Sequence, residues 1–447
     1  MPPSQQAVET RPAPPGRVLG RTRHYEYEWD TTPGRLRVAR LVLVLGILLA
    51  GGVAAYATNA RVDATRDIAD HLEPLNNNVT TLYQSLADAD ATVAAGYLSG
   101  GVEPNEIRAR YDRDVVTATA NLAQASTQAS GEVVTTNRIA DITTQLPVYT
   151  GLVERARANN RQGLAVGAAY LRRASDLMQN SILPAAAELQ RRQAARLADT
   201  YQRAGSVPVV ALVAGGASLV GLIWVQVFLF QRTHRVFNIG LLAASGAVLA
   251  GLVWWTVAGM VSASFLTSSH RHSQSVSDAL GPAQIAALQA RAVESLELVN
   301  REGATSEPDF DARMQLLAQS DGAGGALGAA RQFATDHQGQ VLVQAAVDDA
   351  RDYATAHREV RRLDDVGDYT KAVDAAVDTQ KASAATAFDR LNSALNAAVK
   401  HELEVFRSDI GRAQGWLTGL PTGIGGLAIG AAVGVALGVR QRLEEYR

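Results

Sequence analysis

The 447-residue sequence contains no cysteine, which excludes a disulfide framework, a zinc–thiolate site and a cysteine nucleophile. It also lacks an excess of either charge. The 42 basic and 44 acidic side chains give a formal net charge of −2, so bulk electrostatics do not favour nucleic acid as a partner. A phosphate loop, a zinc-protease helix and a nucleophile elbow are absent as well. We therefore expect a protein that is not an enzyme, has no catalytic residues, and needs neither a cofactor nor a metal.

Four long apolar segments interrupt an otherwise polar sequence. They cover residues 41–58, 205–230, 236–266 and 413–439, and none of them contains a charged side chain. About 20 apolar residues are enough to cross the hydrocarbon core of a bilayer. The absence of internal charges argues against an ion pathway or a proton relay within the membrane. The sequence thus predicts four transmembrane helices in contact with the lipid bilayer.

Arginines gather beside these apolar segments. Seven precede the first segment, Arg232 and Arg235 separate the second from the third, and three follow the fourth. Short basic flanks stay in the cytoplasm, whereas long domains are translocated regardless of charge. We expect a multi-pass protein of the plasma membrane with both termini in the cytoplasm. The predicted order is a disordered cytoplasmic tail (1–37), a transmembrane helix (38–58), an extracytoplasmic domain (59–204), a transmembrane helix (205–230), a cytoplasmic loop (231–235), a transmembrane helix (236–266), a second extracytoplasmic domain (267–412), a transmembrane helix (413–439) and a cytoplasmic tail (440–447).

The two extracytoplasmic domains have the same length, 146 residues each. An offset of 204 residues aligns them, and it superimposes Glu103-Pro104 on Glu307-Pro308, Tyr149 on Tyr353 and Gly163 on Gly367. Identity between the halves is sparse, but the register is the same at all three landmarks. The chain is therefore interpreted as a divergent internal repeat.

Each domain has the pattern of four helices. They are predicted at 61–98, 105–129, 132–159 and 164–203 in the first domain, and at 267–302, 309–336, 340–363 and 368–412 in the second. Apolar side chains recur at steps of three and four, and the alternating β-branched pattern of strands is missing. Pro74 and Pro184 inside two of these helices predict kinks. The expected fold is an all-α membrane protein, with four transmembrane helices carrying two tandem extracytoplasmic four-helix bundles.

This arrangement resembles known sensor proteins. The bundles are similar to the four-helix sensor domains of bacterial chemoreceptors in segments such as residues 91–98 and 156–160. The whole chain more closely resembles actinobacterial GlnX-type four-pass membrane proteins. The matching features are the arginine-rich lead-in with residues 24–30, the four spans and the two helical loops. The resemblance implies an amino-acid-binding lipoprotein outside, specific for acidic amino acids, and a cytosolic Ser/Thr protein kinase, protein kinase G, inside.

Two functions are open at this point. The leading hypothesis is a transmembrane signal transducer that senses extracytoplasmic amino acids and relays their presence to the kinase. Aspartate or glutamate would reach it through the solute-binding lipoprotein. The alternative is a structural or scaffolding protein of the cell envelope, accessory to a transport or respiratory complex. A homo-oligomer is compatible with either function.

Aromatic and acidic residues alternate in the tail before the first span. In an extended strand, Tyr25, Tyr27 and Trp29 would share one face. The functional hypothesis is a docking strand for the cytosolic partner. The alternative is an aromatic anchor at the membrane interface.

Glycine recurs at every fourth position of the last span, at Gly426, Gly430, Gly434 and Gly438. Small residues at this spacing allow two helices to approach closely. The stripe predicts helix packing, within this chain or between two copies of it.

The turns farthest from the membrane carry polar side chains that are candidates for docking an extracytoplasmic partner, because loops on rigid scaffolds often carry function. Ordinary polar loop chemistry is the alternative for each of them. The candidates are Glu103, Asn159, Asn160 and Arg161 in the first domain, and Glu307, Asp364, Asp365 and Asp368 in the second.

Overall fold

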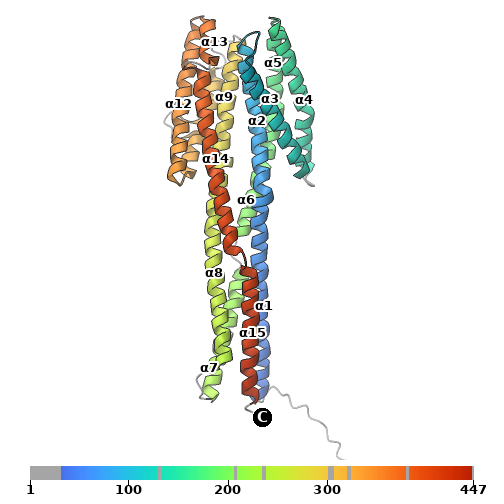
Figure 1. The fold of residues 1–447 in the computed structure, drawn as a ribbon, viewed down its shortest axis with the longest axis vertical. Coiled ribbons are helices and arrows are strands. Elements are labelled where there is room, and N and C mark those ends of the chain that lie inside the picture. The colour runs from blue at the N-terminus through green and yellow to red at the C-terminus, as the bar shows by residue number, and fades with distance from the viewer. Residues whose placement is uncertain are drawn as a thin grey trace, which may run out of the picture.

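The computed structural model describes residues 32–128, 133–205, 209–233, 238–300, 307–319, 324–378 and 382–444, and within these ranges it contains helices and no strand. The predicted all-α membrane fold is confirmed, since four of the helices are long and apolar enough to cross a membrane. The molecule is a long rod (Figure 1). The four apolar segments form one end, here called the membrane end, and the polar bundles form the other, here called the distal end.

The first half of the chain folds as two long helical rods joined by two shorter helices. The elements are α1 (Thr32–Asp67), η2 (Ile68–Leu72), α2 (Glu73–Leu98), α3 (Asn105–Gln128), α4 (Val133–Arg161), α5 (Val166–Leu177), η3 (Met178–Ile182), α6 (Leu183–Gly205) and α7 (Val209–Thr233). α1, η2 and α2 follow one another without a break, so residues 37–98 form a single helix of 62 residues. At about 1.5 Å per residue, such a helix is about 90 Å long.

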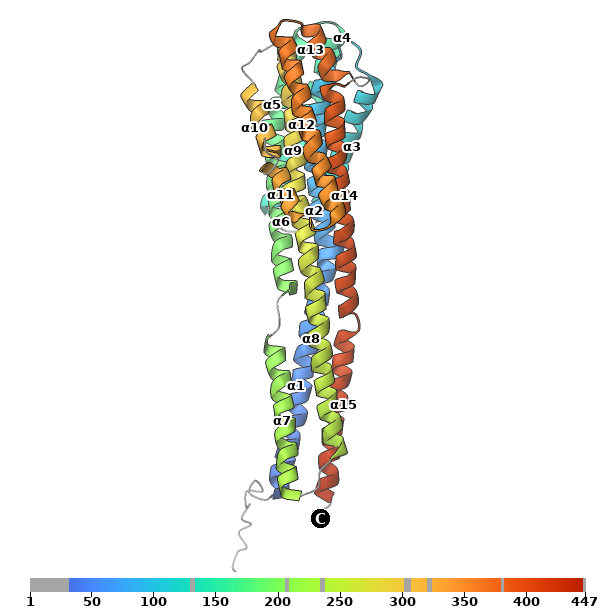
Figure 2. The same ribbon diagram turned by 90° about the vertical axis from the view of Figure 1, so that its left-hand side faces the viewer.

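The second half repeats this plan with two additional interruptions. Its elements are α8 (Ile239–Gln274), η4 (Ser275–Leu280), α9 (Gly281–Asn300), α10 (Glu307–Leu317), α11 (Gly325–Phe333), α12 (His337–Asp365), α13 (Tyr369–Val377), α14 (Ala384–Leu417) and α15 (Leu420–Glu444). The start of α1, the end of α7, the start of α8 and the end of α15 lie at the membrane end (Figure 2).

Three of the helices that continue toward the membrane end have a π-helical turn just before a proline, whereas α4 contains Pro147 without such a turn. Ile68–Leu72 precedes Pro74, Met178–Ile182 precedes Pro184, and Ser275–Leu280 precedes Pro282. Proline has no N–H to donate, and its ring displaces the carbonyl four residues earlier. A wider turn accommodates both effects without ending the helix. The two prolines expected to kink their helices therefore introduce local π turns.

Two of the helices expected in the second domain are broken. The predicted helix 309–336 is divided into α10 and α11, and Gly325, the first residue of α11, adopts φ +72°. That left-handed conformation is natural for glycine and strained for other residues. The predicted helix 368–412 is divided into α13 and α14, because Ser383 starts α14 with a capping box completed by Thr386.

The two bundles share one hydrophobic core. α2 packs along α9 at the centre of the distal end, with the other helices of each half on the outer sides (Figure 1). Buried apolar side chains of both halves belong to the same cluster, among them Leu82, Ile142, Tyr149, Tyr353 and Leu391. The halves therefore act as one folded body at the distal end.

Below the bundles, the four long rods come together as a single neck. Ile68, Tyr201, Leu266 and Phe406, one from each rod, lie in the same buried cluster. In the membrane part, α15 lies against both α1 and α8, whereas α7 has fewer close neighbours. The last rod is not a straight helix, since Gly419 adopts φ +77° between α14 and α15.

Candidate functional site

A cavity of about 200 Å³ lies at the distal end of the first bundle. It is enclosed where α2 ends, where α3 begins and where α4 turns into α5. Its walls carry three arginines and one glutamate among smaller and apolar residues. The polar and aromatic lining residues are Tyr97, Glu103, Asn105, Arg108, Arg157, Asn160 and Arg161.

Two glycine turns shape this cavity. Gly100 (φ +81°) follows the end of α2, and Gly163 (φ +68°) makes the turn from α4 to α5. Only glycine adopts this conformation without strain. The amide of Asn160 donates to the carbonyl oxygen of Tyr97 at 3.0 Å, which ties the α4–α5 turn to the end of α2. The chain thus holds three helix ends around one space.

The charges inside the cavity are only partly balanced. Arg157 is 7% exposed, and its guanidinium binds Glu103 at 2.9 Å and Glu154 at 2.8 Å while lying over the Tyr111 ring. Its Nε has no hydrogen-bond partner among the described residues. Arg108 reaches Glu154 only at 3.4 Å. The lining therefore has more positive than negative charge.

The predicted docking residues of the first domain divide between cavity and surface. Glu103, Asn160 and Arg161 line the cavity. Asn159 does not, because its amide donates to the carbonyl oxygen of Arg155 on the same helix at 2.8 Å. Of the predicted residues in this domain, the structure thus brings three together.

In the second domain, three of the four predicted docking residues bind residues close to them in the sequence. Asp364 and Asp365 bind the guanidinium of Arg361 at 3.0 and 3.2 Å. Asp368 caps α13 by accepting from the backbone N–H of Lys371. Glu307 is the first residue of α10. Tyr25, Tyr27 and Trp29 lie outside the described residues.

The structure also shows a pair of buried carboxylates that the sequence analysis did not identify. In the first bundle the Tyr149 hydroxyl donates to Asp90 at 3.5 Å, and in the second the Tyr353 hydroxyl donates to Glu294 at 3.3 Å. Both pairs are 59 residues apart, so they correspond through the 204-residue offset. An acidic residue at the same distance before each landmark tyrosine was the signal that could have revealed them.

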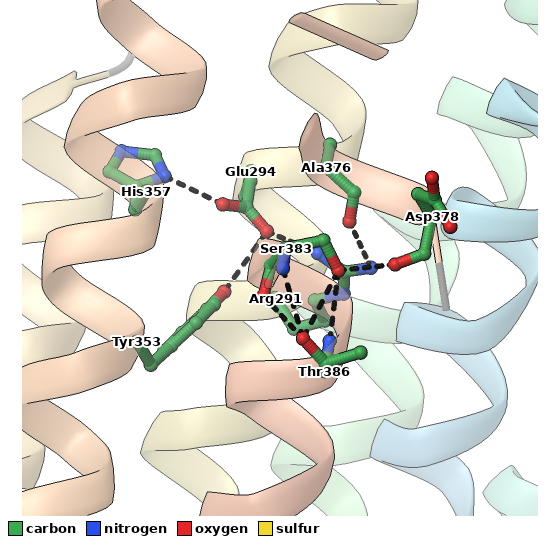
Figure 3. Close-up of polar contacts among 8 residues, drawn as sticks. All are labelled: Arg291, Glu294, Tyr353, His357, Ala376, Asp378, Ser383 and Thr386. Atoms are coloured by element: carbon green, nitrogen blue, oxygen red, sulfur yellow. Dashed lines mark hydrogen bonds and ion pairs between the residues drawn. The ribbon is translucent and has the colours of Figure 1, made fainter. Parts of the chain in front are cut away.

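The surroundings of the two carboxylates differ. Glu294 lies between Arg291, Tyr353 and His357, whose Nδ1 is 2.9 Å away (Figure 3). Burial raises the pKa of Glu294, but Arg291 and His357 outweigh this effect and the net pKa is lowered. Phe310 stacks on the His357 ring. The second bundle thus contains an ionised, well-paired network.

Asp90 in the first bundle has neutral partners. It accepts hydrogen bonds from Ser175 and Gln179, both at 2.9 Å, in addition to Tyr149. Burial raises its pKa from 3.8 to about 6, and these hydrogen bonds oppose only part of that shift. Because the folded-state pKa is raised, the stability that Asp90 contributes is fully present below about pH 4 and is lost as the pH rises through 6.

We predict that Asp90→Asn will change the pH dependence of stability. Relative to the wild type, the variant should gain about 2–3 kcal/mol between pH 4.5 and 7.5, because it cannot ionise in the buried site. Melting temperatures of the full chain in nanodiscs over this pH range measure the difference. Asp141→Asn, at an exposed surface position, is the control and should show no trend. Parallel curves for the Asp90 variant and the wild type would contradict the assignment.

Among the polar contacts that connect the halves, two lie between the bundles. The Arg110 guanidinium binds Asp88 of its own half at 2.9 Å and Asp389 of the other half at 3.0 Å. The side chains of Gln84 and Gln284 are hydrogen-bonded across the α2–α9 contact. Relative movement of the two bundles would have to break these contacts.

The four glycines of the stripe in the last span differ in their surroundings: two lie against another helix and two do not. Gly434 and Gly438 lie against Gly240 of α8, where an added Cβ at Gly434 would come within 2.9 Å of the Gly240 carbonyl oxygen. Asn238 donates to the carbonyl oxygen of Gly438 at 2.7 Å in the same contact. An added Cβ at Gly426 or Gly430 would meet nothing within 4 Å. The structure therefore places the close approach in the C-terminal half of the stripe, within this chain.

A side-chain cluster suited to metal binding was not found among the described residues.

The first half of the chain matches a known protein family. Residues 64–202 match the family model of the actinobacterial sensor domain. This match covers the first bundle, which includes the cavity and Asp90, and the part of the neck that belongs to the first half. No curated protein and no solved structure matches the chain. The first half is thus similar to an actinobacterial sensor domain, which indicates a sensing or signalling role for a membrane protein with four candidate spans.

Proposed function

We propose that this chain is a non-enzymatic transmembrane signal transducer. Its bundles sense amino acids on the extracytoplasmic side, with aspartate or glutamate presented by a solute-binding lipoprotein, and the signal passes to a cytosolic Ser/Thr protein kinase. Both termini lie in the cytoplasm in this proposal. The observation that carries it is the uninterrupted helix from residue 37 to residue 98, whose distal end lines the cavity and whose other end crosses the apolar region.

The connection between cavity and membrane is direct. Val93, Gly96 and Tyr97 of α2 line the cavity, and the same helix continues through η2 into α1 (Figure 2). On the other side of the cavity, Leu171 of α5 belongs to the rod that continues through η3 into α6. A ligand that moves α2 relative to α5 would therefore shift two rods in the neck. Shifts of 1–2 Å between packed helices are a common form of such transitions.

The tail before α1 is the proposed contact for the kinase. Tyr25, Tyr27 and Trp29 form an aromatic group in the residues before α1. The neighbouring acidic side chains would favour a basic groove on the partner. The distal turns, which carry Arg161 and the Asp364-Asp365 pair, are the proposed contact for the lipoprotein.

The experiment compares cells with and without the chain while external aspartate or glutamate is changed. Phosphorylation of cytosolic kinase substrates should follow the supply in complemented cells and not in the deletion strain. Replacement of Tyr25, Tyr27 and Trp29 by alanine should leave the protein inserted but abolish the response. Alanines at Gln5, Gln6 and Val8 are the control and should leave it intact.

Two results would contradict this proposal. A response that survives deletion of residues 1–30 would show that the output leaves by another segment. An unchanged phosphorylation response in the deletion strain, together with defective assembly of an envelope complex, would favour the scaffolding alternative.

A further inference from the structure

The turns at the distal ends of the two bundles correspond in backbone but not in charge. Gly163 and Gly367 both adopt positive φ at the end of an antiparallel helix pair. At the same offset of 204 residues, Arg157 corresponds to Arg361. Both arginines are buried to the same extent, at 7% exposure. The repeat thus places a buried guanidinium at the same point of each bundle.

The partners of these two guanidinium groups differ. Arg361 is bound by two carboxylates of its own turn, Asp364 and Asp365. In the first bundle the corresponding positions are Asn160 and Arg161. The second turn therefore supplies two carboxylates of its own, whereas the first has an amide and an additional cation in their place, and Arg157 is bound by Glu103 and Glu154 from outside the turn.

The space near Arg157 is also different. A cavity of about 200 Å³ lies beside it, into which Arg108 and Arg161 add two further guanidinium groups. Among the described residues, none accepts a hydrogen bond from the Arg161 side chain, and the Nε of Arg157 is buried without an acceptor. Guanidinium groups pair with carboxylates through short, charge-assisted hydrogen bonds. Three guanidinium groups and one carboxylate line the cavity, which gives it the chemistry of a site for an anionic ligand.

We propose that this cavity binds a small dicarboxylate directly, such as an acidic amino acid, which supplies the two carboxylates that the first turn lacks. Arg161 and Arg108 bind the carboxylates at the open side, and Arg157, which Glu103 and Glu154 already hold, forms part of the wall. Glu103 is the only acidic lining residue and is positioned to accept from an ammonium group. This inference deepens the proposed function and rests on it for the consequence of binding, but not for the binding itself.

Calorimetric titration of the full chain in nanodiscs tests the proposal. The ligands are L-aspartate, L-glutamate and succinate, with L-alanine as the monocarboxylate control. The dicarboxylates should bind and L-alanine should not. Arg161→Gln should weaken binding about tenfold or more, as expected for the loss of a charge-assisted hydrogen bond. Arg155→Gln, on the exposed face of the same helix, should bind like the wild type.

A second variant transfers one residue of the second turn to the first. Arg161→Asp gives the first bundle the carboxylate of Asp365 and keeps Asn160, whose amide holds the turn to the carbonyl oxygen of Tyr97. The variant should fold, with an unchanged helical circular dichroism spectrum, and should lose dicarboxylate binding. Binding that persists in this variant would overturn the proposed site.

The outcomes separate this inference from the proposed function. If the wild-type chain binds no dicarboxylate but the cellular response to aspartate remains, direct binding is wrong. In that case the carboxylates come from a partner protein, and the transducer proposal stands. If the dicarboxylate binds and the cell shows no response to it, the site is correct and the transducer proposal fails.

Discussion

Substitution of Arg291 by methionine is expected to destabilise the second bundle by about 3–5 kcal/mol, because it leaves the carboxylate of Glu294 buried without its cation. Both side chains lie in the interior, with exposures of 5% and 1%. Arg291 also donates to the carbonyl oxygen of Ala376 at 3.0 Å, near the C-terminal end of α13 (Figure 3). Hydrogen exchange of α9 and α12 amides in the nanodisc-embedded chain measures the loss as a lower free energy of local opening.

Two further variants separate the buried charge from the lost side chain. A double variant, Arg291→Met with Glu294→Met, should recover part of the stability, because replacing both members of a buried ion pair is far less costly than removing one. Arg390→Met is the surface control. Arg390 is about half exposed and pairs with Asp349 and Asp352, so its loss should cost under about 1 kcal/mol. An Arg291 variant as stable as the Arg390 variant would refute the buried network.

A comparable loss is expected in the membrane from Gly434→Leu combined with Gly438→Leu. The new side chains would meet the backbone of Gly240 and the Asn238 side chain, and a backbone cannot move aside as a flexible side chain can. Overpacking costs about 1–3 kcal/mol per site, and the double variant should also lose the hydrogen bond from Asn238 to Gly438. The folded fraction of the chain in an SDS titration reports the effect.

The same stripe provides the matched control. Gly426→Leu combined with Gly430→Leu introduces the same side chains on the same helix, at positions where nothing lies within 4 Å. This control should unfold at the same SDS concentration as the wild type. Equal sensitivity of the two double variants would mean that α15 does not pack on α8 through Gly240. Sensitivity of the control alone would indicate a partner helix from another copy.

The membrane helices and most bundle helices could be predicted because their signals are local. Hydropathy identifies a span without reference to the rest of the chain, and the three- and four-residue steps of apolar side chains identify a buried helix face. The offset of 204 residues also relates Asp90 to Glu294 and Arg157 to Arg361, buried groups that lie outside the glycine and tyrosine landmarks.

The contacts between distant segments could not be predicted in the same way. The α2–α9 contact contains Gln84 and Gln284, side chains that a sequence pattern assigns to a solvated face. The glycine spacing in α15 predicts a close approach, but it does not tell which half of the stripe has a neighbour. The break before α14 could have been predicted from the sequence, since Ser383 and Thr386 have the spacing of a capping box.

The central claim is that the distal end and the membrane end are mechanically connected, and the absence of cysteine allows a direct test. Spin labels on cysteines at Leu41 and Phe230 report the separation of α1 and α7, and labels at Ile239 and Leu437 report that of α8 and α15. All four side chains are exposed near the ends of their spans. Distances are measured with and without saturating L-aspartate, alone and with the loaded lipoprotein. We predict that the distance between the labels on α1 and α7 changes by about 1–2 Å. Identical distances in both pairs, with ligand or loaded lipoprotein demonstrably bound, would contradict it.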